Sequence, residues 1–443
     1  MIPNLSGHKA PPTPLNPSTT TRFRWVIVGL LFLATTVNYI DRQILALLKP
    51  QLDTELGWTN EQYGNVNSAF QAAYALSYVA FGWFIDRVGI KLGYAISIVC
   101  WSLAALAHGF VGSVRGFFFA RIALGAGEGG NFPACIKTAA CWFPQRERAF
   151  AASLFNSGTN VAPLIAPALV PWIALHYGWQ MCFIVAGSAG FLWLALWLPL
   201  YKNNPGDSRF VSPAERDLIE SDHQPAPTGP ALGWLQLFTY RQTWAIVLAK
   251  FLTDPVWWFF LIWLPDFFKK TRGLDLKNSW THLVAIYAIA TVLSLAGGWL
   301  SGRLIRAGWT ITRARKTAMF IFSLCVIPVV FAPQTNEWLA VFLIGLAGAA
   351  HQAWSATIYA STSDMFPKRS IAAISGIAGM AGAVGGMLFP PFAGAMLDHY
   401  KSTAGGESDG YAILFIMCGS AYVVAFALNH LFAPRFDQIR PNG

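Results

Sequence analysis

Long apolar stretches separated by short polar segments run through most of the chain. A helix needs about 20 mostly apolar residues to cross a bilayer, and scanning with that length predicts twelve spans. They begin near Trp25, Asn65, Gly93, Gly116, Phe150, Gln180, Thr243, Leu283, Thr317, Trp338, Ile371 and Tyr411. The pattern therefore predicts an all-α, polytopic membrane protein.

Composition and charge support this class. Hydrophobic residues make up 55% of the 443 positions and charged residues 12%, whereas soluble domains carry about 25% charged residues. If the N-terminus is cytoplasmic, about 20 of the 31 Lys and Arg fall on that side of the membrane, about 7 on the other and about 4 inside spans, which is the positive-inside asymmetry. The net charge of +10 is thus explained by the membrane, and we expect membrane lipid but no nucleic acid as a partner, with both termini in the cytoplasm.

Polar segments divide the chain into two halves. The expected parts are a disordered cytoplasmic tail at 1–21, a six-helix bundle at 22–201, a cytoplasmic linker at 202–241, a second six-helix bundle at 242–432 and a cytoplasmic tail at 433–443. Within the linker, Ser212-Pro213-Ala214-Glu215 has the capping-box pattern that opens a short helix.

Two motifs recur between the halves. Gly82-x-x-x-Asp86-Arg87 is echoed by Gly298-x-x-x-Gly302-Arg303, and Phe143-Pro144-Gln145-Arg146 is echoed by Phe366-Pro367-Lys368-Arg369. The offsets, about 216 and 223 residues, are nearly equal. They predict two pseudo-symmetric six-helix bundles around a midplane cavity, the architecture of alternating-access carriers.

The first motif also suggests a conformational latch. Gly82 would let helices approach closely, Asp86 would accept hydrogen bonds from helix ends and arginines of the other bundle, and Arg87 and Lys91 would face anionic headgroups. The alternative is a basic loop that only orients the protein. Gly302 replaces the acid in the second copy, so a C-terminal latch would be weaker.

Four ionisable residues interrupt the apolar spans: Asp41 and Arg42 in the first, Arg121 and Glu128 in the fourth. A charged side chain at mid-bilayer costs at least about 2.5–3.5 kcal/mol on insertion scales, so the four predict a shared, partly wet interior site. Arg121 and Glu128 share a helical face but are about 10 Å apart along its axis. They cannot pair directly without another group.

Proton coupling is our hypothesis for this site. Glu128 lies in a run of small residues, and a carboxyl group that moves between a dehydrated environment and one beside an arginine can bind and release a proton. We expect Glu128 to carry the proton, Arg121 to couple its charge to the substrate, and Asp41 to be a second titrating or gating acid. The alternative is a static charge network that holds helices together.

The motifs resemble those of the major facilitator superfamily and, within it, the anion:cation symporter family. The resemblance rests on Asn38-Tyr39-Ile40-Asp41-Arg42, the loop motif at Gly82, Arg121 with Glu128-Gly129-Gly130-Asn131-Phe132-Pro133, Phe155-Asn156-Ser157-Gly158-Thr159-Asn160 and Ser363-Asp364-Met365-Phe366-Pro367-Lys368-Arg369. Residues 250–258 and 297–306 are most similar to bacterial hexuronate transporters. The resemblance implies proton-coupled uptake of glucuronate- or galacturonate-like acids across the bacterial inner membrane, with coupling carried at the Asp41, Arg121 and Glu128 positions.

A sugar acid needs a cation for its carboxylate, polar partners for its hydroxyls and a flat apolar wall. The candidate substrate-binding residues are Tyr39, Arg42, Tyr74, Arg121, Asn156, Asn160, Trp257, His351 and Gln352, with Trp258 as an alternative to Trp257. His351 stands at the 223-residue offset from Glu128. Packing roles are the alternative for each. The Lys250 and Asp254 pair is interpreted first as structural, with Lys250 as a further candidate cation.

Several other classes are disfavoured. The six cysteines lack C-x-x-C spacing, so neither a disulfide framework nor a metal site is expected. No Gly-rich nucleotide loop is present, and no nucleophile or metal constellation accompanies the buried acids, which argues against a pump or an enzyme. We expect a monomeric symporter without cofactors, with the proton as coupling ion. A symporter for an aldonate such as galactonate or gluconate, or for an aromatic acid, remains an alternative, as do a channel and a non-transporting sensor on the same fold.

Overall fold

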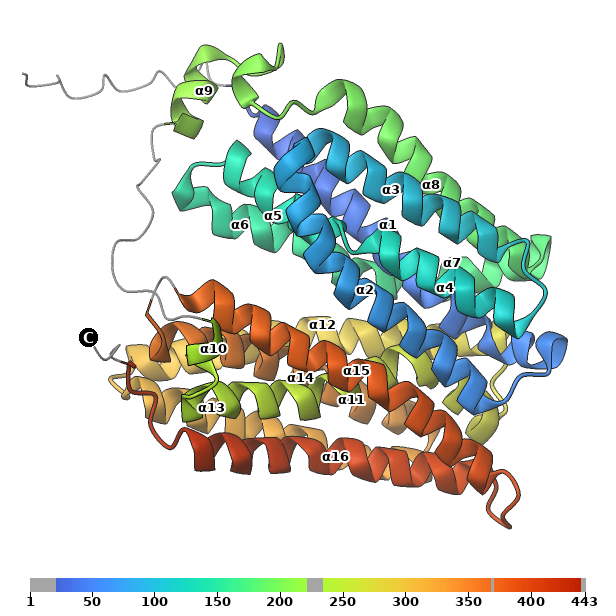
Figure 1. The fold of residues 1–443 in the computed structure, drawn as a ribbon. Coiled ribbons are helices and arrows are strands. Elements are labelled where there is room, and N and C mark those ends of the chain that lie inside the picture. Colours follow the sequence, from blue (N-terminus) through green and yellow to red (C-terminus); the bar gives the residue numbers. More distant parts are fainter. Residues whose placement is uncertain (1–20, 221–233, 368–369, 440–443) are drawn as a thin grey trace, which may run out of the picture.

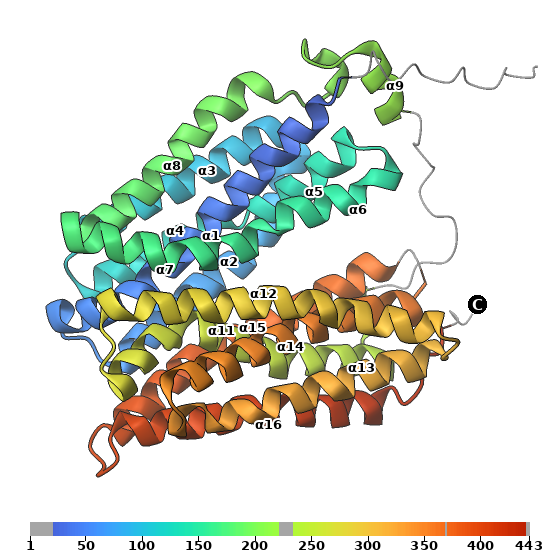
Figure 2. The same cartoon turned by 180° about the vertical axis from the view of Figure 1, so that it is seen from behind.

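The computed structural model describes residues 21–220, 234–367 and 370–439, and these form two bundles of helices (Figures 1 and 2). The first bundle contains α1 (Phe23–Leu56), α2 (Asn60–Val88), α3 (Ile90–His108), α4 (Val114–Glu128), α5 (Asn131–Trp142), α6 (Gln145–Asn156), α7 (Gly158–Tyr177) and α8 (Trp179–Leu200). The linker holds η2 (Pro205–Asp207), α9 (Pro213–Glu220) and α10 (Trp234–Leu237). The second bundle contains α11 (Arg241–Arg272), α12 (Leu276–Arg306), α13 (Ile311–Val326), η3 (Ile327–Gln334), α14 (Glu337–Met365), α15 (Ile371–Tyr400) and α16 (Glu407–Phe432).

Ten helical stretches in the described residues are long and apolar enough to cross a membrane, where the sequence predicts twelve. The two that fall short are those expected near Asn65 and Gly116. The first is α2, whose polar residues lower its hydropathy, and the second is divided into α4 and α5 at Gly129 and Gly130. Both still pack within the first bundle, so the two-bundle, all-α architecture is confirmed.

Small residues let α4 pack closely against its neighbouring helices. A Cβ at Gly125 would overlap the backbone of Phe70 in α2, and one at Gly127 would overlap the backbone of Trp101 in α3. The run of small residues before Glu128 therefore gives α4 a close approach to α2 and α3. It leaves Glu128, at the end of α4, with no exposed surface.

The two bundles meet at one end and diverge at the other (Figure 1). We call the end with α9, α10 and the last described residues the linker face, and the end with the turns at 57–59 and 401–406 the distal face. On the distal side, the Tyr63 hydroxyl donates to the Ile262 carbonyl at 3.0 Å and the Ser68 hydroxyl donates to the Met387 carbonyl at 2.7 Å. Contacts between the bundles thus close the distal side.

The loop motif expected to form a latch lies at the linker face. Lys137 of α5 pairs with Asp86 at 2.6 Å and also donates to the Gly82 carbonyl at 2.6 Å, so Asp86 is bound within its own bundle. A Cβ at Gly82 would meet nothing within 4 Å, so the expected close helix approach is wrong for this conformation, because the bundles diverge here. Arg87 lies over the Trp83 ring, 3.9 Å from its centroid, and the Lys91 amide donates to Asn203 at 2.8 Å. The latch itself stays a prediction.

The linker helix α9 is bound to the start of α1. The Glu215 amide donates to the Ser212 hydroxyl at 3.2 Å, as the capping-box pattern predicts. The reciprocal bond of the box is absent among the described residues. Instead, the Glu215 carboxylate accepts from Arg24 Nη1 at 2.8 Å and from the amides of Phe23 and Arg24 at 3.1 and 3.2 Å. Glu215 therefore caps the start of α1, where its carboxylate accepts four hydrogen bonds from residues 21–24. The Ser212 amide, which would donate to Glu215 in a capping box, donates to the Thr21 hydroxyl instead.

Replacing Glu215 by Ala should destabilise the first bundle by about 2 kcal/mol, since the amides of Phe23 and Arg24 lose their acceptor while Arg24 keeps its pair with Glu147. Arg24 and Glu215 have side-chain exposures of only 8% and 0%. The measurement is the thermal unfolding midpoint of the purified protein. Glu220→Ala is the matched control on the same helix, since Glu220 forms an exposed pair with Arg216; equal losses in the two variants would contradict the capping role.

The described end of the chain packs on the second bundle. The Phe436 amide donates to the Thr312 hydroxyl at 3.0 Å, the Ile439 amide donates to the Met365 carbonyl at 2.8 Å, and both side chains are buried. Residues 433–439 are thus a docked segment of the expected 433–443 tail. Of the expected tail at 1–21, only Thr21 lies within the described residues.

Candidate substrate and proton site

Two of the four interior charges form a buried ion pair between α1 and α4. Arg42 Nε donates to Glu128 Oε2 at 2.7 Å, and Arg42 Nη2 donates to Asn38 Oδ1 at 3.2 Å. The Arg42 guanidinium lies over the rings of Tyr39 and Tyr74, 4.6 and 4.4 Å from their centroids. These contacts fix the orientation of Arg42 and make it the direct cation of Glu128, a partner that the sequence analysis did not assign.

Arg121 lies in the same interior, but two of its guanidinium nitrogens have no hydrogen-bond partner in the residues that the structure describes. It is 1% exposed, and its Nε and Nη2 have no hydrogen-bond partner among the described residues. The described part of the chain shows no ion pair between Arg121 and Glu128, as their spacing along α4 predicts. Buried guanidinium groups bind carboxylates through charge-assisted, often bidentate hydrogen bonds. Arg121 therefore has donors to offer to an anion.

Asp41, on α1, is the least satisfied of the interior charges. It is 1% exposed, and neither of its carboxyl oxygens has a hydrogen-bond partner among the described residues. The same is true of Glu128 Oε1. Asp41 interacts electrostatically with Glu128, Arg121 and Arg42. It lacks the donors that a buried carboxylate requires, although opposite charges lie within electrostatic range.

A small pocket, with a cavity volume of about 20 Å³ in this conformation, lies between the bundles beside the two arginines. We call it the arginine pocket; its lining is Tyr39, Arg42, Gln43, Asn67, Phe70, Gln71, Arg121, Trp258, Leu261 and Ile262. The first bundle supplies the cations and amides, and α11 of the second bundle supplies an apolar wall. This combination suits a carboxylate that also carries hydroxyls.

A second small pocket, with a cavity volume of about 10 Å³, also lies between the bundles. We call it the tryptophan pocket; its lining is Asn160, Pro163, Trp257, Tyr287, Ala290, Thr291 and Gln352. It brings together Asn160 of the first half with Trp257 and Gln352 of the second, three of the candidate binding residues. The two tryptophans weighed as alternatives thus line different pockets.

His351 stands behind the tryptophan pocket rather than in its lining. Its ring stacks on Trp257 with centroids 5.3 Å apart and an interplanar angle of 4°. Its Nδ1 is 2.6 Å from the Tyr422 hydroxyl, and the residue is 6% exposed. These contacts hold the Trp257 ring in place. His351, the residue at the repeat offset from Glu128, thus supports the pocket without lining it.

Two other candidates lie outside these pockets. Asn156, at the end of α6, is exposed and lines neither pocket. Lys250 pairs with Asp254 at 2.8 Å and donates to the Ser355 hydroxyl at 3.0 Å, which fits its structural interpretation.

Three pocket residues were missed by the sequence analysis: Gln43, Tyr287 and Thr291. Gln43 directly follows Asp41-Arg42, and Tyr287 and Thr291 are four residues apart on one face of an apolar span. Polar residues at helical spacing inside an apolar span indicate a helix face that lines an interior site. In the second span, Asn67, Gln71, Tyr74 and Tyr78 recur at the same helical spacing, and Asn67 and Gln71 enter the arginine pocket from α2.

Comparison with known proteins decides the family. The family model of the Major Facilitator Superfamily matches residues 31–390. The chain belongs to this superfamily. It is accordingly a multi-pass membrane transporter and not an enzyme.

Relatives and a solved structure agree with this membership. The chain is 33% identical over 386 residues to the hexuronate transporter of Escherichia coli (strain K12), covering 85% of this chain and 88% of that protein. It is 28% identical over 401 residues to the D-galactonate transporter of Escherichia coli O6:H1, covering 87% and 92%. A crystal structure of a bacterial homologue of the human lysosomal transporter Spinster, inward-facing and unoccupied, superposes with a TM-score of 0.76 at 18% identity, covering 96% of this chain and 100% of that one. This likeness confirms the fold.

Proposed function

We propose that this superfamily member is a proton-coupled symporter that imports a hexuronate, such as glucuronate or galacturonate, by alternating access. The observation that carries the proposal is Arg121: a buried cation with unpartnered donors at a pocket lined with amides between the two bundles. The similarity to the hexuronate transporter of Escherichia coli supports the substrate class.

The arginine pocket suggests how the anion binds. The substrate carboxylate would be bound by Arg121, since its Nε and Nη2 have no other partner among the described residues. Sugar hydroxyls would bond to Asn67 and Gln71 on α2, and the ring would lie against Trp258. Amides both donate and accept hydrogen bonds, which suits hydroxyls of either orientation.

The Arg42–Glu128 pair suggests how a proton is coupled to the anion. A proton on Glu128 removes its charge and weakens its 2.7 Å bond with Arg42, and Arg42 then becomes a second cation for the substrate. After the anion leaves, Arg42 pairs again with Glu128 as the proton is released. Asp41 would serve as the second titrating acid. Two protons per monovalent anion would make uptake voltage-sensitive, at about 2.3 kcal/mol per 100 mV for each net charge.

We further propose that the linker face is cytoplasmic, in a bacterial inner membrane. The positive-inside asymmetry supports this orientation. The structure, closed at its distal face, would then correspond to the conformation that faces the cytoplasm. Both bundles belong to one chain, so a monomer would contain the whole pathway.

Purified protein should be tested by thermal shift against glucuronate, galacturonate, gluconate, galactonate and 4-hydroxyphenylacetate, followed by proton-driven uptake and counterflow in proteoliposomes. Selective stabilisation by hexuronates is expected, because bound ligand stabilises the folded protein. Galactonate is the second candidate, since the D-galactonate transporter is also a relative. Stabilisation by galactonate alone would make galactonate, and not a hexuronate, the proposed substrate. Binding without flux would contradict transport.

Replacing Trp257 by Ala should raise the KM for the hexuronate about tenfold, an effect of about 1.4 kcal/mol, because an apolar face of the tryptophan pocket is lost. Trp257→Phe should retain most of the affinity, since a ring remains against His351. Trp244→Ala is the matched control, a half-exposed tryptophan on the same helix. An unchanged KM in Trp257→Ala would remove this pocket from the binding site.

A further inference from the structure

A buried lysine, Lys49, joins the two bundles at the distal face. Lys49 of α1 has no exposed surface, and its Nζ donates to Asp53 at 2.8 Å, to Asn60 at 2.9 Å and to Asp266 at 2.8 Å. Asp53 and Asn60 belong to the first bundle, whereas Asp266 is in α11 of the second. The Lys49–Asp266 pair, with both side chains at 0% exposure, therefore crosses the interface between the bundles.

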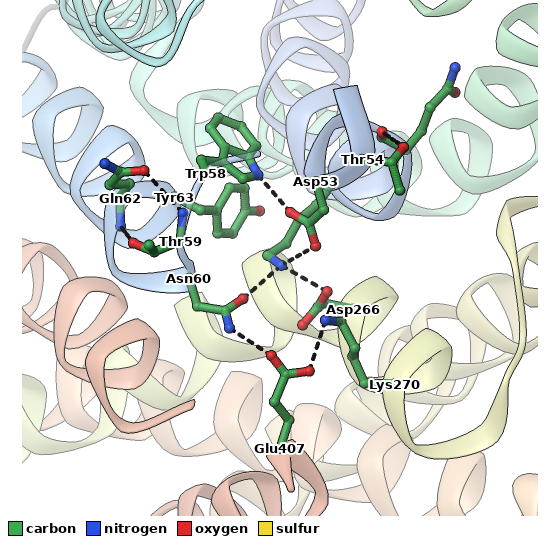
Figure 3. A network of polar contacts seen from close by, with 12 residues as sticks. Asp53, Thr54, Trp58, Thr59, Asn60, Gln62, Tyr63, Asp266, Lys270 and Glu407 are labelled. Carbon is green, nitrogen blue, oxygen red and sulfur yellow. Dashed lines mark hydrogen bonds and ion pairs between the residues drawn. The ribbon is translucent and has the colours of Figure 1, made fainter. Parts of the chain in front are cut away.

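Further polar contacts surround this pair. The Asn60 side-chain amide donates to Glu407 of α16 at 2.9 Å, and Glu407 pairs with Lys270 at 2.8 Å. Asp266 accepts a second hydrogen bond from the Tyr411 hydroxyl. Asn60 thus links the Lys49–Asp266 pair to the Lys270–Glu407 pair, and these residues form one connected polar network (Figure 3).

The second bundle also caps a helix of the first. Asp398, near the end of α15, accepts from the backbone amides of Asn60 at 3.1 Å and Glu61 at 2.8 Å, the first two residues of α2. Thr59 caps the next donor, the Gln62 amide. Carboxylates stabilise helix N-termini, so α2 has a complete cap only while the bundles are in contact.

Lys49, Asp266 and Glu407 would each keep a local partner if the bundles separated. Lys49 would keep Asp53, which is four residues away on the same helix, and Asp266 would keep Tyr411. Glu407 would keep Lys270. A buried charge without a partner is strongly unfavourable, and retained local partners avoid that state. The network can therefore break and form again.

We propose that Lys49, Asn60, Asp266, Asp398 and Glu407 form a reversible gate at the distal face. In the closed state, the Lys49–Asp266 pair and the Asp398 cap hold α1 and α2 against α11 and α15. Opening breaks both contacts and uncaps α2, which connects the arginine pocket to the distal side. The proposal rests on alternating access, and it assigns to these residues the step that admits substrate.

Hydrogen exchange of the purified full-length protein measures the gate without substrate. In Asp266→Asn, a peptide covering residues 58–66 should exchange at least about tenfold faster, because the amides of Asn60 and Glu61 lose the Asp398 cap more often. Glu337→Gln is the matched control: Glu337 contacts His282 within the second bundle alone. Acceleration confined to 58–66 and to the facing ends of α11 and α15 supports the gate. Unchanged exchange, or equal acceleration throughout α13, overturns it.

A double variant tests whether the two charges act together. Lys49→Met and Asp266→Asn break the same contact, so the combined variant should exchange no faster than the faster single variant. Additive acceleration would show that the charges act separately and would contradict the gate. Absence of flux for every anion tested, with this exchange pattern intact, would count against the proposed symport and not against the gate.

Discussion

Replacing Glu128 by Gln is expected to abolish proton-driven accumulation of the hexuronate while counterflow between two substrate pools continues. Gln has the size of a protonated Glu and cannot release a proton, so it should fix the site in the state in which Arg42 is free to contact the substrate. Uptake against a gradient should fall at least about 100-fold, in the range by which proton-transfer groups act in catalysis. The measurements are pH-gradient-driven uptake and counterflow in the same proteoliposomes.

Glu147→Gln is the control for this variant. Glu147 is also an acid of the first bundle paired with an arginine, Arg24, but it lies at the start of α6 rather than in the interior site. It should accumulate substrate like the unmodified protein. Retained accumulation in Glu128→Gln would contradict the carrier role. Loss of folding, seen as aggregation on size exclusion, would favour a static network.

Replacing Arg121 by Ala is expected to raise the hexuronate dissociation constant at least about 100-fold. Losing one side of a buried, hydrogen-bonded charge pair costs about 2–5 kcal/mol, and every 1.4 kcal/mol changes affinity about tenfold. Arg121 has two buried nitrogens with no partner among the described residues. Replacement by Ala therefore removes donors that only the substrate would use. Thermal shift and equilibrium binding measure the effect.

Arg115→Ala is the matched control on the same helix. Arg115 is exposed near the start of α4 and lies outside the arginine pocket, so its loss should leave affinity unchanged. Arg121→Lys should recover part of the binding, since a lysine restores charge but not the planar pair of donors. If Arg121→Ala binds the hexuronate normally, the carboxylate must be bound elsewhere, and Lys250 becomes the next candidate.

The sequence predicted the interior site where its signal was unambiguous. Asp41, Arg121 and Glu128 interrupt apolar spans, and the structure places all three in the interior. It was less informative about partners. Glu128 of α4 pairs with Arg42 of α1, 86 positions away along the chain, and Glu215 caps α1 rather than its own helix.

The sequence by itself determined the apolar spans, the two repeated halves and the residue types of a buried charged site, because membrane insertion restricts polar groups along the chain. Only the tertiary structure decided which charges pair, which pocket each tryptophan lines, and that Lys49 meets Asp266 across the two halves. Lys49 and Asp266 are 217 residues apart along the chain. Their geometry depends on how the bundles pack, and no local pattern specifies that.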